Sequence, residues 1–186
     1  MSEAFEAIEE LTAEALEIIG SHPEINTRPI RITHAHSVYM QGRLEEAIKL
    51  FGPFKDDKYA LANLCVSLVK TKQNEKAEAL LAGADNGDAF AIASLAVAML
   101  YVSRGQIEFG VTLALRAVTE DTCTDEAWYY LKQCVASLIE KLIQRSAKMS
   151  EQLYKEVIEF LDRAMRWRVR EEAALLKKVL MSLYFK

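Results

Sequence analysis

Apolar residues recur every three or four positions from the start of the chain, a spacing that places them on one face of a helix. The first stripe consists of Phe5, Ile8, Leu11, Leu16 and Ile19. Gly20 follows it, and glycine commonly ends helices because it adopts the left-handed backbone conformation without strain. The pattern predicts an amphipathic N-terminal helix over residues 1–20. This helix needs a surface to pack against, because isolated helices are marginal in water.

A polar turn followed by a helical pattern occurs three times in the middle of the chain. The three stretches are residues 41–51, 72–81 and 105–114. A small residue stands at the same place in each stretch. These residues are Ala47, Ala77 and Gly110, which lie 30 and 33 positions apart. Because a bulky side chain there would force two paired helices apart, the repetition predicts stacked helical hairpins without strands.

The C-terminal part of the chain predicts longer helices. One helix runs from Thr124 to about residue 145, and its partner runs from Ser150 to Arg168, with Ser150 as a plausible N-cap. A last helix begins at about Arg170 and carries its own apolar stripe. Terminal elements of helical repeat proteins are usually atypical because they cap the core, so we interpret this helix as a cap.

Two motifs resemble the tetratricopeptide repeat, which has a period of about 34 residues. The turn followed by Glu45-Glu46-Ala47 is similar to the second helix of such a repeat, and Trp128-Tyr129-Tyr130-Leu131 is similar to the opening of the first helix. The resemblance implies units that begin at Arg28, Lys58, Ala91 and Asp125. We therefore expect an all-α fold, an α-solenoid of three to four tetratricopeptide-like hairpins. The expected single domain over residues 1–186 comprises an N-terminal helix (1–20), repeats (28–120), an atypical long hairpin (125–169) and a capping helix (170–186).

In the tetratricopeptide family the first helix of each hairpin lines a concave groove, and four of its positions face the ligand. Carried over by register, these positions are Ile32, His36, Tyr39, Tyr59, Ala62, Val66, Val69, Ile92, Leu95, Met99, Val102, Glu126, Tyr129, Gln133 and Ala136. Asn63 stands where co-chaperones that hold C-terminal carboxylates have an asparagine, but the charged companions of that clamp are missing. The groove is apolar and aromatic, so the resemblance implies binding of an apolar or amphipathic segment of a partner protein.

The occupant of this groove stays open at the level of sequence. The partner could be a client of a small chaperone or a subunit of a larger assembly. The chain could also fill the groove with its own terminal helices, as a self-contained scaffold, or with a second copy, as a homo-oligomer. Small acidic tetratricopeptide proteins resemble bacterial type III secretion chaperones, and Ile30-Arg31-Ile32 ahead of Gln41-Gly42-Arg43 is similar to the chaperones of the needle subunit.

Charge is distributed unevenly along the chain, whose net charge is −4. Residues 1–27 hold seven Glu and no Lys or Arg, whereas residues 145–186 hold ten basic and six acidic side chains. The basic stretch consists of Arg163, Arg166, Trp167, Arg168 and Arg170. Arginine with tryptophan can hold phosphates and stack on bases, so an adaptor associated with nucleic acid is an alternative. Neighbouring acids favour a solvated helix face with local ion pairs, and nucleic acid is not the expected partner.

Residues with catalytic or metal-binding chemistry do not form recognisable motifs. The three cysteines lack the spacing of a zinc site or a disulfide framework, and Cys123 is expected to be the most exposed because it lies in a turn. His34 and His36 are two positions apart, so on a helix they cannot chelate one metal together. Without an apolar run of roughly 18 residues, no membrane span is expected. We therefore expect a cytoplasmic, non-enzymatic protein with no cofactor, no metal and no small-molecule substrate.

Overall fold

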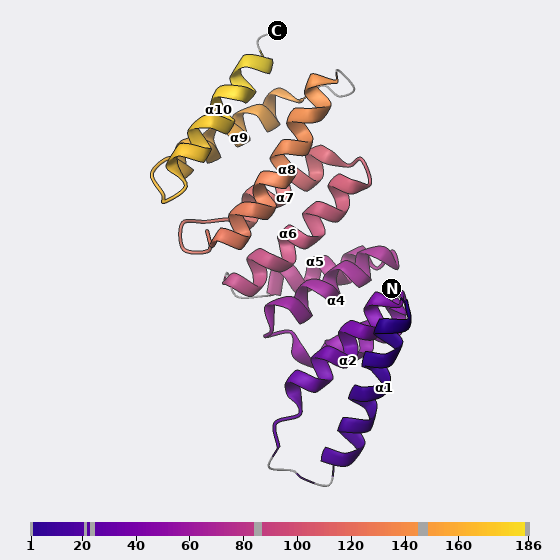
Figure 1. Ribbon diagram of the computed structural model, residues 1–186. Helices are drawn as coiled ribbons and strands as arrows, with labels where there is room; N and C mark the ends of the chain where they lie inside the picture. Colours follow the sequence, from indigo (N-terminus) through magenta and orange to yellow (C-terminus); the bar gives the residue numbers. More distant parts are fainter. Residues whose placement is uncertain (1, 21, 23–24, 84–86, 145–148, 185–186) are drawn as a thin grey trace. The chain divides into compact units, whose positions relative to one another are not determined.

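The computed structural model describes residues 2–20, 22, 25–83, 87–144 and 149–184. Within these ranges the chain forms α-helices and one short 3-10 helix, with no strand (Figure 1). The helices are α1 (Ser2–Ile19), α2 (Arg28–Met40), α3 (Leu44–Phe51), η1 (Gly52–Phe54), α4 (Lys58–Lys70), α5 (Asn74–Gly83), α6 (Asp88–Ser103), α7 (Ile107–Ala117), α8 (Asp125–Ile143), α9 (Glu151–Ala164) and α10 (Arg170–Tyr184). The predicted all-α architecture is confirmed.

The chain divides into two compact units, residues 1–93 and 94–186. The single domain expected over residues 1–186 stays a prediction, because compact groups of hairpins also occur within one repeat array. In the first unit consecutive helices from α1 to α5 pack on one another, and α2 also lies beside α4 (Figure 1). In the second unit α7 packs on α8 and α9, and α10 packs on both α8 and α9. The first helices of neighbouring hairpins, such as α2 and α4, therefore lie side by side.

The turns between the paired helices share one backbone conformation. Gly42, Lys72 and Gly105 all have positive φ angles, of 81°, 62° and 81°. The amide three residues beyond the end of each helix closes a six-residue loop on the last turn, which satisfies a carbonyl that the helix end leaves open. These hydrogen bonds run from Arg43 to Val38 (3.2 Å), from Gln73 to Leu68 (2.8 Å) and from Gln106 to Tyr101 (3.0 Å). The repetition seen in the sequence is therefore a repetition of backbone geometry.

Replacing Lys72 with glycine should raise the free energy of unfolding by about 1 kcal/mol. A lysine in the left-handed region carries a steric penalty of roughly 1 to 2 kcal/mol, which glycine removes. Glycine also gives the unfolded chain more conformational entropy, and this cancels part of the gain. Urea denaturation monitored by circular dichroism measures the change. Lys76→Gly is the matched control, because Lys76 lies inside α5, where glycine should destabilise by about 1 kcal/mol. An equal loss for both variants would contradict the strained turn.

The small residues of the repeat lie in the interior of the chain. Ala47 and Ala77 are buried. A β-carbon added to Gly110 would lie 2.7 Å from the Ala98 carbonyl oxygen and 2.7 Å from a methyl group of Val102. Both neighbours belong to α6, so a side chain at this position would require α6 and α7 to shift apart. The role inferred from the spacing is confirmed at Gly110, and it stays a prediction at Ala47 and Ala77.

Helix ends match the sequence-based boundaries at most positions. The Ser150 side chain accepts a hydrogen bond from the Leu153 amide (3.3 Å), as expected for an N-cap, and the Thr124 side chain caps α8 in the same way. One boundary differs, because α9 ends at Ala164, four residues before the predicted end at Arg168. α6 begins at Asp88, three residues before the repeat start implied at Ala91.

Candidate protein-binding surface

Neighbouring first helices of the first unit carry a cluster of aromatic and polar side chains. We call it the α2–α4 face and define it by Ile32, His36, Tyr39, Tyr59, Asn63, Val66 and Lys70. Each helix contributes residues three or four positions apart, which lie on one side of the helix. Tyr59 is 52% exposed, and His36 and Lys70 are also exposed. Ile32, Tyr39 and Asn63 are half-buried, and Val66 is nearly buried.

Contacts across the α2–α4 face hold its side chains in place. Asn63 Nδ2 lies 3.3 Å from His36 Nδ1, which links the two helices. Lys70 Nζ donates a hydrogen bond to the Tyr39 hydroxyl (3.2 Å) and lies 5.0 Å from the centre of its ring. A cation at this distance is attracted by the face of the ring. The face is therefore ordered without a partner.

Lys70 adds a positive charge to a surface that the sequence predicts to be apolar and aromatic. Lys70 lies one position beyond Val69, the last groove position of its helix, so the positions carried over from the family do not include it. Its relation to Tyr39, 31 residues earlier, is set by the packing of α4 beside α2. The only signal in the sequence is its spacing of four residues from Val66, which places both on one side of the helix.

The N-terminal helix α1 is anchored along α2. Thr12 Oγ1 lies 3.0 Å from His34 Nδ1, and the ring of Phe5 meets the ring of His36 edge-on at 6.5 Å. At the far end Glu9 accepts hydrogen bonds from Gln41 and Arg43, both at 2.7 Å. The hydrogen bond from Gln41 and the charge of Arg43 lower the pKa of Glu9, although partial burial opposes them. α1 thus borders the α2–α4 face at His36, and the filling of the groove by a terminal helix stays a prediction.

The remaining predicted groove positions differ in how much surface they offer. Ala62, Val69, Ile92 and Leu95 are buried, and Met99 and Val102 are half-buried. On α8, Tyr129, Gln133 and Ala136 are exposed and Glu126 is half-buried. The predicted groove extends over both units, and its continuity stays a prediction. Within each unit the surface available to a partner consists of the exposed subset of these residues.

The basic stretch lies at the end of α9 and in the turn that follows it. Arg168 donates two hydrogen bonds to the Cys123 carbonyl (2.8 and 3.1 Å) and pairs with Asp125, so this guanidinium ties the turn to the start of α8. Two of the flanking acids pair elsewhere. Glu172 accepts from Lys132 and from the Trp128 indole, and Asp162 accepts from Lys177. These two acids therefore pair with lysines of α8 and α10 rather than with the arginines of the basic stretch.

A cavity of about 610 Å³ adjoins this stretch in the second unit. Phe160 and Trp167 form part of its wall, with their rings edge to face at 5.6 Å, and charges of both signs surround them. The charged lining residues are Arg116, Glu120, Glu156, Glu159, Arg163 and Arg166. Three acids offset three arginines, so the cavity lacks the positive surplus of a phosphate-binding site. The nucleic-acid alternative stays a prediction.

The cysteines lie in apolar surroundings. Burial raises the pKa of the Cys65 thiol to about 12 and that of Cys134 to about 11. Cys123 is buried as well, although at 6% it is the most exposed of the three, as expected for its place in a turn. Its carbonyl accepts hydrogen bonds from Arg168, which hold the turn in place. Burial raises its pKa too, so these thiols stay protonated at neutral pH, and a thiol is a far weaker nucleophile than a thiolate.

The described residues were also considered as ligands of a metal and as spans of a membrane, and they offer neither arrangement. Among residues 2–20, 22, 25–83, 87–144 and 149–184, no three His, Cys, Asp or Glu side chains converge as a metal site would require. Over the same ranges, none of the helices combines the length and the apolar character of a membrane span.

Residues 1–180 match the family model described as the intraflagellar transport protein 70 C-terminal domain. The chain belongs to this family. Among its relatives is intraflagellar transport protein 70A2 of Rattus norvegicus, which is 25% identical over 185 residues, covering 86% of the chain and 27% of the rat protein. A tetratricopeptide repeat protein 30 homolog of Caenorhabditis briggsae is 29% identical over 157 residues, covering 70% of the chain and 24% of that protein. The chain spans about a quarter of the length of the curated relatives it matches.

Family membership confirms the resemblance to tetratricopeptide repeats, because two nematode relatives carry that repeat in their names. The Caenorhabditis elegans relative is 27% identical over 183 residues and covers 84% of the chain. The family that matches is not the type III secretion chaperones, so the short likeness around Ile30 gains no support from these comparisons.

Proposed function

We propose that the chain is a protein-interaction module of an intraflagellar transport assembly, and that it holds an apolar or amphipathic segment of a partner on the α2–α4 face. The observation that carries the proposal is the exposure of Tyr59 beside ordered polar side chains, within a family whose members are named for intraflagellar transport. Binding of this kind needs no catalytic group. The chain would act on the transport machinery of the cilium, a more specific place than the cytoplasm at large.

Tyr59 and Tyr39 are suited to anchoring a partner segment. Aromatic side chains provide a large contact area with few rotatable bonds, and interface residues that dominate affinity are enriched in tyrosine, tryptophan and arginine. The Lys70 ammonium is next to Tyr39. A cation beside an apolar anchor favours segments that carry an acidic residue at the corresponding place. The preferred partner segment would therefore combine apolar anchors with an acidic side chain.

Replacing Tyr59 with alanine should reduce capture of intraflagellar transport proteins about tenfold or more. Loss of one central aromatic anchor removes roughly 2 kcal/mol of binding free energy, and 1.4 kcal/mol corresponds to tenfold in affinity. The tagged chain is incubated with extract of ciliated cells, and captured proteins are quantified by mass spectrometry. Circular dichroism of the variant checks that the helices are intact.

Phe109→Ala is the matched control for this experiment. Phe109 is 53% exposed, nearly the same as Tyr59, but it lies on α7, a second helix, where its ring contacts Tyr101. Capture by this variant should match that of the unaltered chain. An equal reduction for both variants would show that exposed aromatics in general are responsible, and an unchanged Tyr59→Ala would remove the α2–α4 face from the proposal.

A further inference from the structure

A second apolar stripe runs along α1 beside the face that packs on α2. We call it the outer α1 stripe and define it by Ala4, Ile8, Leu11, Ala15 and Ile18. Leu11 is 65% and Ile18 is 69% exposed, and Ile8 is exposed as well. By contrast, the residues that reach α2 or the turn beyond it, such as Phe5 and Thr12, are half-buried. α1 therefore presents apolar side chains on two sides, and the described structure covers one of them.

The spacing of the outer α1 stripe is the spacing of a helix-pairing seam. Its members are four, three, four and three positions apart, which is the pattern of the two apolar positions of a heptad repeat. The seam extends over 15 residues, from Ala4 to Ile18, or roughly 21 Å at a rise of 1.5 Å per residue. The geometry suits a partner helix of about four turns that lies along α1.

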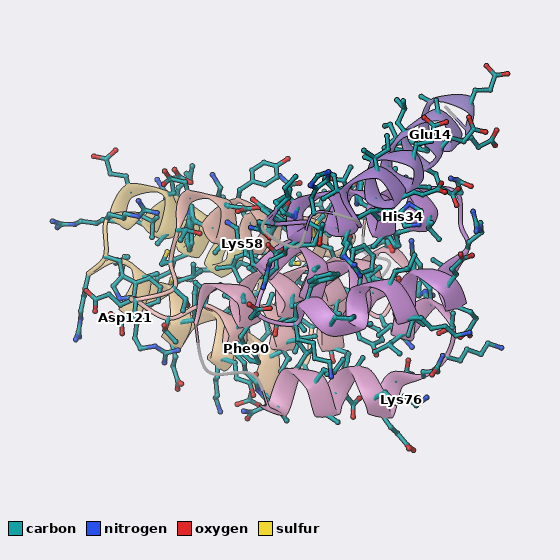
Figure 2. The ribbon with its side chains drawn as sticks, turned by 90° about the horizontal axis from the view of Figure 1, so that it is seen from below. Glu14, His34, Lys58, Lys76, Phe90 and Asp121 are labelled. Carbon is teal, nitrogen blue, oxygen red and sulfur yellow. The ribbon has the colours of Figure 1, made fainter. Side chains whose placement is uncertain are left out.

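A row of glutamates borders this seam. Glu3, Glu6, Glu10, Glu14 and Glu17 are all exposed, and they recur at helical spacing along one side of α1. Glu14 is three residues from Leu11 and four from Ile18, so the row runs directly beside the stripe. Figure 2 shows Glu14 on α1 at the margin of the first unit. Residues 1–27 contain seven glutamates and no lysine or arginine.

Neither pairing of two α1 helices suits a second copy of the chain as the occupant of the seam. In an antiparallel pair of α1 helices, equivalent edges would face each other, so two glutamate rows would be juxtaposed and would repel. In a parallel pair, the glutamate edge would face the opposite edge of the other helix. That edge carries Phe5, Thr12 and Ile19, and it is occupied by α2.

We propose that the outer α1 stripe docks an amphipathic helix of a partner protein, with a leucine or isoleucine seam and a row of lysine or arginine along one edge. The apolar side chains of the two seams would pack together and be removed from water, and this burial would be the source of affinity. The basic edge would lie along the glutamate row and fix the orientation of the partner. This surface is separate from the α2–α4 face, so the chain would hold two different segments at once.

Two synthetic helical peptides of about three heptads test the proposal. Both carry the same leucine and isoleucine seam, and they differ only in having lysine or glutamate along the edges. Fluorescence anisotropy with the full chain should show the lysine peptide binding at least about tenfold more tightly than the glutamate peptide. Binding should weaken as salt rises from about 0.05 to 0.5 M, because the Debye length falls from above 10 Å to below 5 Å.

Leu11→Glu and Leu175→Glu are matched variants of the chain. Both leucines are exposed to nearly the same extent, 65% and 63%, but Leu175 is on α10 in the second unit. Each variant adds one negative charge, which by itself would strengthen general attraction to a basic peptide. Leu11→Glu should nevertheless weaken binding at least about tenfold because it places a charge in the seam, whereas Leu175→Glu should change it less than about twofold.

Several results would overturn the proposal. They are absence of binding by the lysine peptide, equal binding of the two peptides, and equal effects of the two glutamate variants. A dimer of the unaltered chain in sedimentation that Leu11→Glu converts to a monomer would identify a second copy as the occupant. Tyr59→Ala should leave peptide binding unchanged, so failure of this proposal is distinguishable from failure at the α2–α4 face.

Discussion

Replacing Gly110 with leucine will lower the free energy of unfolding by about 3 kcal/mol or more. A β-carbon at this position would lie 2.7 Å from the Ala98 carbonyl oxygen and 3.1 Å from the Val102 amide nitrogen. Both are backbone atoms of α6, so relief requires that the two helices separate. Overpacking in a close-packed interior destabilises by roughly 1 to 3 kcal/mol, and a leucine adds three more carbons to the clash. Urea denaturation followed by circular dichroism measures the loss.

Gly52→Ala is the control for the Gly110 variant. Gly52 has a φ of −49°, and a β-carbon added there meets nothing within 4 Å. Its replacement should change stability by less than about 0.5 kcal/mol, or improve it, because alanine restricts the unfolded chain. The loss of stability in Gly110→Ala should lie between those of Gly110→Leu and Gly52→Ala, because the helix propensity of alanine offsets part of the clash. A Gly110→Leu variant as stable as the original would mean that α6 and α7 can move apart freely.

Hairpin structure was predictable because it depends on local chemistry. A turn residue in the left-handed conformation, a small residue five positions later and an apolar stripe at helical spacing are all readable in the sequence. Helices α2, α4 and α8 begin at Arg28, Lys58 and Asp125, as the repeat register implied. Even the turn at Lys72, where glycine is missing, adopts the same backbone conformation as the other two. The hairpin as a whole overrides the preference of the single residue.

Features that depend on distant contacts were not predictable in the same way. α9 ends at Ala164 because the following turn brings Arg168 to the carbonyl of Cys123, 45 residues earlier. The same contact holds the turn of Cys123, so that this residue is buried even though it is the most exposed of the three cysteines. Lys70 joins the α2–α4 face through Tyr39 on another helix. Spacing along the chain gives the direction of a side chain from its own helix, but the neighbour it meets is decided by packing.

The predicted groove residues also divide into a part that the sequence predicts, their positions on the first helices, and a part that packing decides, their burial. The family register identifies positions on the first helices, and several of these positions, among them Tyr59 and Tyr129, are exposed. Others, such as Val69 and Leu95, are buried. Apolar residues at consecutive turns of a helix can serve either a core or a binding surface, and a single sequence does not distinguish them. α6 illustrates the problem because its side chains are apolar on nearly every side.

Leu95→Glu should lower the free energy of unfolding by about 4 kcal/mol or more, and Met99→Glu by much less. Leu95 is fully buried, whereas Met99, one turn later on α6, is half-buried. Burying leucine contributes roughly 1.5 to 3 kcal/mol, and forcing a carboxyl into the same space adds several more because the charge loses its hydration. Met99→Glu can turn its carboxylate towards water and keep the helix.

Thermal and urea unfolding of the two variants separate a structural role of α6 from a binding role. If Leu95→Glu unfolds while Met99→Glu remains folded, Leu95 acts in the core, and Met99 is the position at which partner capture can be tested on an intact chain. Equal stability of both variants would contradict the burial of Leu95. The comparison matters for the groove, because a loss of binding in an unfolded variant carries no information about the surface that a partner contacts.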